Sequence, residues 1–200
     1  MKKIKFVCCL MMTLLPITGC SDKAQATPSE VVAAFLDAYQ SHDNQKIAQY
    51  STWENYDATA LELRDEDYMD GVNKDLQKKV YDMMLDFSHK ENSEAIQDDT
   101  AKVEVTLTMY DFEPTIKSGM EAATKKTDEL SKNESIRDEE IQKEILTTLF
   151  EHMEKAEKSK SVTTTVHLIK KDKEWKVSED NNDLSDALLI NTQSIQDVAE

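Results

Sequence analysis

Cysteine, glycine and proline are scarce in this sequence, with three of each among 200 residues. Cys8 and Cys9 lie in the apolar start of the chain, and Cys20 follows shortly after it. From residue 21 onward the sequence has no thiol, which excludes a disulfide framework and a free reactive thiol in that part. The stability of the folded part must therefore come from packing. So few glycines and prolines also leave little room for low-complexity linkers.

Basic residues are scarce relative to acidic ones: 24 Lys and Arg stand against 40 Asp and Glu, for a net charge of −16. A surface this acidic argues against nucleic acid as a partner, because nucleic-acid binding requires basic patches. After the first residues no apolar run reaches the ~18 residues of a membrane-spanning helix. We therefore expect no transmembrane helix, and we interpret the acidic excess as a solvated surface rather than a specific cation site.

Residues 1–19 have the layout of a secretory signal peptide. Three lysines stand among the first five residues, an apolar run extends from Phe6 to Leu15, and Pro16 ends it. The run of about ten residues is too short to cross a hydrocarbon core of ~30 Å as a lasting helix. We therefore expect residues 1–19 to direct export and then to be removed.

The end of that segment, Ile17-Thr18-Gly19-Cys20, resembles the lipobox of bacterial lipoproteins. The resemblance implies cleavage between Gly19 and Cys20, a diacylglycerol on the Cys20 thiol, and a place on the outer face of the bacterial cell membrane. Residues 20–26 would then be the anchored cysteine and a short polar tether. Cleavage removes three lysines and no acid, so the net charge of −16 becomes −19. Such a chain gains nothing from an anionic membrane surface, and the lipid alone must hold it there.

Apolar residues at helical spacing predict several helices in the first half of the remaining chain. Thr27 can cap a helix, Pro28 suits its first position, and Glu30 completes a capping box. The apolar stripe of this helix extends over residues 31–39, and a short second helix follows near residues 47–50. Residues 51–70 have no clear period, and a third helix is predicted over residues 71–86.

Alternating polar and apolar residues then predict strands. The clearest strand covers residues 103–109, a weaker one precedes it at 87–97, and two more cover 162–168 and 175–177. Between the strand pairs, residues 114–158 return to helical spacing, and a closing helix over 184–190 would be capped by Asp183. The fold class is therefore α+β in a single domain of residues 27–190: N-terminal helices and a helical excursion pack on a curved antiparallel sheet of about four strands, followed by a tail of residues 191–200.

Three segments resemble the cystatin-like, nuclear-transport-factor-2-like lipoproteins of Gram-positive bacteria, a group largely of unknown function. They are EVVAAFLDAYQSHDNQKIAQY, AKVEVTLTMYDF and VTTTVHLIKKDKEWKVSEDNNDLSDAL. The last resembles a terminal hairpin with a buried tryptophan, here Trp175, although Lys173 and Glu174 stand where that turn often has glycine. The resemblance implies a curled sheet around a conical hollow, and it implies no function, because such folds host enzymes, binders and scaffolds.

No catalytic, metal-binding or cofactor-binding set emerges from the sequence. The four histidines are not at metal-ligand spacing. The acidic run from Asp65 to Gly71 fails the calcium-loop rule, since glycine is not at the sixth position and glutamate is not at the twelfth. The run from Glu179 to Asp183 is explained by a turn and a helix cap. Tyr110 and Asp111 are adjacent on a strand and point to opposite faces, so they cannot act on one ligand as in ketosteroid isomerases.

These observations favour a non-catalytic binding module for an envelope ligand or protein. The alternative is a structural or accessory subunit of an envelope complex, and a hydrolase or isomerase is less favoured. The helical excursion distinguishes these possibilities, because its apolar stripe must be covered. We favour an excursion that plugs the hollow of the sheet, and the other arrangement is a lid over its mouth.

Overall fold

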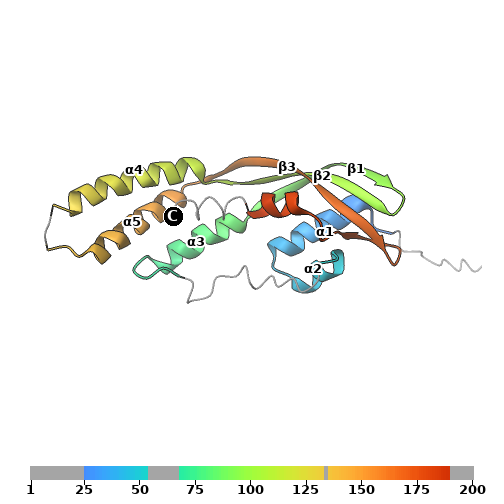
Figure 1. Ribbon diagram of the computed structural model, residues 1–200, viewed down its shortest axis with the longest axis horizontal. Coiled ribbons are helices and arrows are strands. Elements are labelled where there is room, and N and C mark those ends of the chain that lie inside the picture. Colours follow the sequence, from blue (N-terminus) through green and yellow to red (C-terminus); the bar gives the residue numbers. More distant parts are fainter. Residues whose placement is uncertain (1–24, 54–67, 133–134, 190–200) are drawn as a thin grey trace, which may run out of the picture.

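The chain forms helices and one antiparallel sheet in a computed structural model that describes residues 25–53, 68–132 and 135–189. The helices are α1 (Pro28–Gln40), α2 (Asn44–Tyr50), α3 (Lys74–Leu85), α4 (Glu113–Leu130), α5 (Asp138–Met153) and a further helix over residues 182–189. The strands are β1 (Phe87–Gln97), β2 (Thr100–Asp111), β3 (Glu157–Lys171) and β4 (Glu174–Val177). They lie in the order β1-β2-β3-β4, each antiparallel to its neighbours, which confirms the predicted α+β class (Figure 1).

Helix α1 begins at the predicted capping box. The Glu30 backbone N–H donates to Thr27 Oγ1 at 3.2 Å, and the Thr27 backbone N–H donates to the Glu30 carboxylate at 2.8 Å. This reciprocal pair satisfies two N–H groups that have no partner inside the helix. The apolar stripe of α1 is buried against the sheet, with Phe35 and Leu36 fully excluded from solvent.

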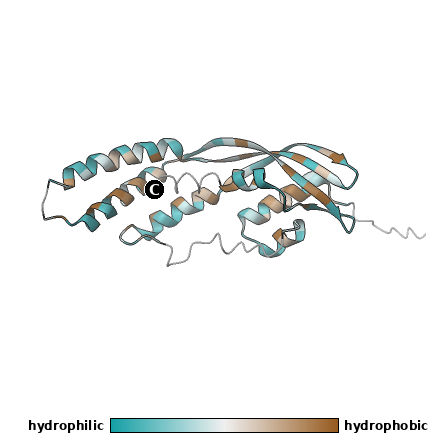
Figure 2. Ribbon diagram, viewed as in Figure 1, coloured by the Kyte–Doolittle hydropathy of each residue, from teal (hydrophilic) through white to brown (hydrophobic). Residues whose placement is uncertain are grey.

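Buried and more exposed residues alternate along β2 and the middle of β3, which gives this part of the sheet one apolar and one polar face. Figure 2 shows hydrophobic and hydrophilic residues interspersed along the sheet. On β2, Val103, Val105 and Leu107 are fully buried on the inner face, which packs against α1. On the outer face, Thr106 Oγ1 lies 3.0 Å from Thr163 Oγ1 of β3. The alternation predicted from the sequence is therefore confirmed, with one wet face.

A first hydrophobic core lies between α1, α2, the inner face of the sheet and residues 182–189. Trp175 of β4 belongs to it and is 6% exposed, so its predicted burial is confirmed. The side chains of α1 occupy the inner face where the sequence resemblance implied a conical hollow. The expected hollow is therefore already filled by the N-terminal helix.

The helical excursion builds a second core away from α1. Helices α4 and α5 form an antiparallel hairpin beyond the ends of β2 and β3, and α3 packs beside α5 (Figure 1). Gly119 lets the two helices approach closely, since a Cβ there would lie 3.0 Å from Leu149 Cδ1. The buried members of this core come from α3, α4, α5 and the adjoining segments: Val72, Val80, Met83, Met84, Phe112, Ile116, Leu149, Phe150, Met153 and Ala156.

The excursion is therefore neither the favoured plug nor a lid. Both interpretations assumed that its apolar stripe faces the sheet, but that stripe meets α3 and α4 instead. Leu149 and Met153 are buried in the second core, whereas Ile141 and Ile145, nearer the tip of the hairpin, are only half-buried. Periodicity showed that a helix needed a cover, and it could not show which element supplies it.

Several helices and strands begin or end at residues other than those predicted from the sequence. The strands predicted at 103–109 and 162–168 are longer, because β2 and β3 form one continuous ribbon with a register shift near Tyr110. The helix predicted over 71–86 begins at Lys74, with the Asn73 side chain accepting from the Leu76 N–H at 3.1 Å. The closing helix begins at residue 182, so Asp183 lies inside it and the prediction of Asp183 as its cap is wrong.

Candidate functional site

Strand β3 is much longer than β4, the strand that pairs with the edge of β3 facing away from β2. Strand β4 pairs only with residues 168–171 of β3. The loop after β4 covers one residue more, His167, whose backbone N–H donates to Asn181 Oδ1 at 2.7 Å and whose carbonyl accepts from the Ser178 N–H at 2.9 Å. Asn181 is 2% exposed, so its hydrogen bonds with the His167 backbone are shielded from water. His167 is the last residue of β3 whose backbone groups are covered in this way.

The next backbone groups on that side of β3 have no partner among the residues that the structure describes. Backbone N–H and C=O groups alternate sides along a strand, so Ser161, Thr163 and Thr165 direct theirs the same way as His167. Within the described ranges none of these six groups has a hydrogen-bond partner. We call the backbone groups of residues 161–165 on this side the open edge.

Within the described ranges, residues 161–166 of the open edge contain no charge, proline or bulge that would oppose pairing with another chain. Its sequence, Ser161-Val162-Thr163-Thr164-Thr165-Val166, is uncharged and consists mostly of β-branched residues, which favour extended structure. The register between β2 and β3 is regular over this stretch. An uncharged, regular strand edge is a template for an additional strand.

The other edge of the sheet, on β1, is protected. A β-bulge lies between Glu91 and Ser93, and charged Lys90, Glu91 and Glu94 line the strand. The backbone N–H and the hydroxyl of Ser29 both donate to the Glu94 carboxylate, at 3.1 Å and 2.7 Å. Bulges and charges are the usual means of preventing edge-to-edge association. The two edges of one sheet are therefore built differently.

A groove accompanies the open edge. Residues 182–189 lie beside it and enclose a groove of about 530 Å³ with residues 162–165. The helix presents an apolar side to the first core through Leu184 and Leu188, both buried. Its other side carries Asp183 and Asp186, both exposed, which line the groove. One wall of the groove is therefore acidic.

The groove also contains an unsatisfied buried hydroxyl. Thr164 is 8% exposed and lies on the inner face of β3, opposite Val105. Its Oγ1 has no hydrogen-bond partner among the described residues. An unpaired buried polar group costs about 1–3 kcal/mol, so the groove contains a group that a partner could satisfy.

Two lysines lie near the start of β3, before the open edge. The Lys158 ammonium lies 2.8 Å from the Asp86 carboxylate and 5.8 Å from the centroid of the Tyr110 ring. Lys160 is half-buried beside Met109 and forms no ion pair with any residue that the structure describes. Lys158 and Lys160 therefore precede the open edge along β3, and Asp183 and Asp186 lie beside its residues 162–165.

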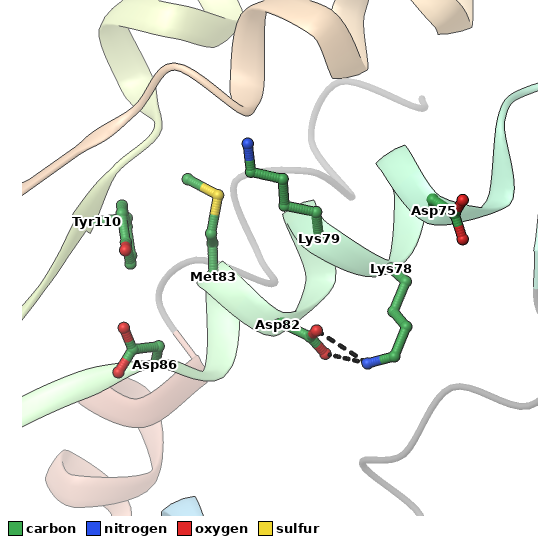
Figure 3. A pocket seen from close by; sticks show the side chains of 7 residues that line it. All are labelled: Asp75, Lys78, Lys79, Asp82, Met83, Asp86 and Tyr110. Carbon is green, nitrogen blue, oxygen red and sulfur yellow. Dashed lines mark hydrogen bonds and ion pairs between the residues drawn. The ribbon is translucent and has the colours of Figure 1, made fainter.

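A separate depression of about 460 Å³ lies on α3, next to Tyr110 of β2 (Figure 3). Most of its charged side chains already form ion pairs: the Lys78 ammonium donates to both Asp82 carboxylate oxygens, at 2.9 Å and 2.8 Å. This hydrogen bond raises the pKa of Lys78 above its ordinary value. The Lys79 ammonium lies 3.2 Å from the carboxylate of Glu154, the residue that follows α5. These pairs make the depression a poor receptor for a charged ligand.

Some of the residues singled out from the sequence lie within the ranges that the structure describes, and others lie outside these ranges. Gly19, Cys20 and residues 65–67 of the acidic run lie outside the described residues, so cleavage and lipidation stay predictions. At the end of that run, Gly71 has a φ of +83° and packs against the Lys143 side chain, which indicates a structural turn. Asp111 accepts from the Glu113 N–H at 3.3 Å, at the start of α4.

The histidines do not form a cluster among the described residues, and two of them contact carboxylates or a hydroxyl. His89 lies between the carboxylates of Asp37 and Glu91, at 3.1 Å and 2.8 Å, and His152 Nδ1 lies 2.9 Å from Ser118 Oγ. In the part of the chain that the structure describes, no group of three or more His, Cys, Asp or Glu residues could hold a metal ion. No helix in those ranges is long and apolar enough to span a membrane.

Comparison with known proteins gives one remote likeness. No family model matches the chain, and no curated protein matches it. Among solved structures, the chain is similar to a candidate lipoprotein (ycdA) of Bacillus subtilis, with a TM-score of 0.40 and 21% identity. The match covers 82% of this chain and 46% of that one, so the chain spans less than half of that protein. A likeness this remote carries no argument, and the nuclear-transport-factor-2-like resemblance stays a prediction.

Sequence reasoning missed the open edge. The strand predicted over residues 162–168 lies within β3, and the lack of charge in residues 162–166 is visible in the sequence. Whether a strand edge is open depends on the length of its neighbour, and β4 has only four residues. Residues 175–177 had been predicted as that neighbour, so comparing the two predicted lengths was the available signal.

Proposed function

We propose that this protein is a lipid-anchored, extracytoplasmic binding module that accepts an extended segment of another polypeptide as an added strand at the open edge. The observation that carries the proposal is the run of six backbone groups that no described residue pairs with, on an uncharged, regular strand beside a groove. Strand addition is a recurring mode of protein recognition, in which main-chain hydrogen bonds supply affinity and neighbouring side chains supply specificity.

The filled inner face of the sheet favours a protein partner over a small ligand. Sites for small molecules are concave and mostly apolar. Here the side chains of α1 occupy the apolar face of the sheet, and the depression on α3 is lined largely by charged residues. A polypeptide strand needs an edge and a groove rather than an enclosed cavity. The proposal is of a non-catalytic protein with no cofactor, in keeping with the sequence.

The proposed lipid anchor at Cys20 determines where the binding module would meet its partner. Cys20 carries the lipid after removal of residues 1–19, and a tether of about six residues spans at most ~20 Å. The domain would then stay close to the membrane surface and meet partners in the envelope. A Cys20→Ala chain is expected to lose labelling by a fatty-acid probe and to stay uncut by the lipoprotein-specific peptidase. Continued labelling of that variant would contradict the anchor.

The strand-addition site can be tested in cells by placing a photo-crosslinking amino acid at Thr163. The same amino acid at Lys90, on the protected β1 edge, is the matched control, because both positions are exposed on edge strands. We expect a covalent adduct from position 163 and little or none from position 90. Equal adducts from both positions, or none from position 163, would contradict strand addition at the open edge.

A second candidate is an accessory subunit that contacts its complex through the α4–α5 hairpin. The observation in its favour is that Ile141, Ile145 and Leu146 of α5 are only half-buried and Met120 of α4 is 42% exposed. The same photo-crosslinker at Met120 would report this contact. Adducts from position 120 and none from position 163 would favour the accessory role.

A further inference from the structure

We propose that the segment accepted by the open edge is the same edge of a second copy of this chain. The two β3 strands would pair antiparallel about a two-fold axis through Val162, and two four-stranded sheets would become one. This inference rests on the proposed function, because it names the segment that the open edge accepts. A two-fold contact uses the same surface on both copies, so the surface must be complementary to itself.

The distribution of charge along the edge meets this requirement. Lys158 and Lys160 lie at the start of β3, and Asp183 and Asp186 flank residues 162–165. In an antiparallel arrangement the start of one strand runs beside the later part of the other. Lys160 of each copy, which has no ion pair with a described residue, therefore comes beside the aspartates of its partner, twice in one interface, whereas Lys158 is already paired with Asp86. Opposite charges brought close together across a contact attract, and like charges repel.

The register follows from the direction of the backbone groups. Ser161 and Thr163 direct their N–H and C=O groups outward, so an axis through Val162 lets Ser161 of each copy exchange hydrogen bonds with Thr163 of the other. Lys160 then lies opposite Thr164, at the groove lined by Asp186. A two-fold axis perpendicular to the sheet keeps both inner faces on the same side. Lys160 and Asp186 therefore share that side.

Both copies carry a net negative charge, but the resulting repulsion is too weak to prevent this contact. Charges separated by more than about 8–10 Å are largely screened at physiological ionic strength, so the groups in direct contact dominate. A basic peptide would match Asp183 and Asp186, but it would meet Lys158 and Lys160 with like charge. Only a segment whose charges run in the opposite order fits both ends, and the antiparallel copy has that order.

The first test introduces a cysteine on the proposed axis. In full-length chain produced in its own membrane, Val162→Cys places two thiols opposite each other at a non-hydrogen-bonded pair, with Cα atoms about 4.5 Å apart. That spacing suits a disulfide. We expect a reducible species of twice the chain mass. The unsubstituted chain corrects for any contribution of Cys20, and Lys90→Cys on the β1 edge is the matched control, expected to give no such species.

The second test exchanges the charges. In the Val162→Cys background, Lys160→Glu places a carboxylate against Asp186 in both halves of the dimer, and Asp186→Lys places an ammonium group against Lys160. We expect each variant alone to lose about tenfold in the dimeric species, since like charges brought close together across the contact repel each other. When the two variants are mixed, the heterodimer keeps one original Lys160–Asp186 pair and gains one pair of reversed sign, so both of its charge pairs are attractive. With tags of different size, that heterodimer should return to the level of the parent chain.

The outcomes separate the two proposals. Dimer from Val162→Cys, loss with each charge variant and recovery in the mixture support the inference. An absence of dimer at position 162, or an equal amount from Lys90→Cys, overturns it. Failure of the mixture to recover also overturns it, because recovery depends on the pairing of positions 160 and 186. If position 163 then still crosslinks to a polypeptide of another mass, strand addition stands and only the identity of the partner is wrong.

Discussion

The molecule has two hydrophobic cores, and they are built from different kinds of secondary structure. The first joins α1 to the sheet, so residues at helical spacing meet residues at strand spacing. The second joins three helices, α3, α4 and α5, beyond the end of the sheet. Each core contains a fully or nearly fully buried amide: Asn181 beside the first and Gln77 in the second. The comparison teaches that the excursion is a structural unit of its own.

The largest effect is expected from the first core. Phe35 is fully buried, and its ring lies 5.1 Å from that of Trp53 in an edge-to-face arrangement. Phe35→Ala should lower the free energy of unfolding by about 3–5 kcal/mol, through lost burial and the cavity left behind. Urea denaturation followed by tryptophan fluorescence measures the change. Ile96→Ala, at a residue that is 55% exposed, is the control and should have little effect; equal effects would contradict the account.

The corresponding change in the second core is Phe150→Ala, with an expected cost of about 3 kcal/mol. The neighbouring stripe of α5 is only half-buried, so this site can collapse more easily than that of Phe35. Hydrogen exchange should show faster exchange in residues 141–153, while residues 103–109 of β2 keep most of their protection. Equal loss of protection in both segments would show that the two cores unfold as one.

The buried amides offer a matched pair. The Gln77 side chain donates to the carbonyls of Met69 and Val72 and accepts from the Met69 N–H, whereas Asn181 bonds both backbone groups of His167. Gln77→Ala and Asn181→Ala should each cost about 1–3 kcal/mol, because backbone groups lose their buried partners. Exchange of the His167 amide should rise only in Asn181→Ala. A rise in Gln77→Ala as well would contradict the separation of the two cores.

The smallest effect is expected at the entry to the second core. Gly71 has a φ of +83°, which an L side chain adopts with strain. Gly71→Ala should therefore cost about 1–2 kcal/mol, measured as a shift in the urea midpoint. Gly71→Asn should cost less, since asparagine tolerates this region of backbone conformation better. An alanine variant as stable as the parent would show that the Lys143 side chain and the turn adjust freely.

Much of the fold could be predicted from local pattern. The capping box of Thr27 and Glu30, the alternation along β2 and the burial of Trp175 were all correct, because each depends on neighbours close in sequence or on a regular period. The cover of the α5 stripe, the filling of the hollow and the start of the closing helix were not. Those depend on residues far apart in sequence, such as Asn181 meeting His167.

The sequence by itself determined the periods: where helices and strands form, which of their faces are apolar, and an export and lipidation signal at Cys20 that stays a prediction. Only the tertiary structure decided which apolar faces meet and which edge of the sheet is left uncovered. The physical reason is that periodicity states that a surface must be buried, whereas the partner is chosen by shape and length across the whole fold. The open edge exists because β3 continues past the four residues of β4, a difference in length that no single segment contains.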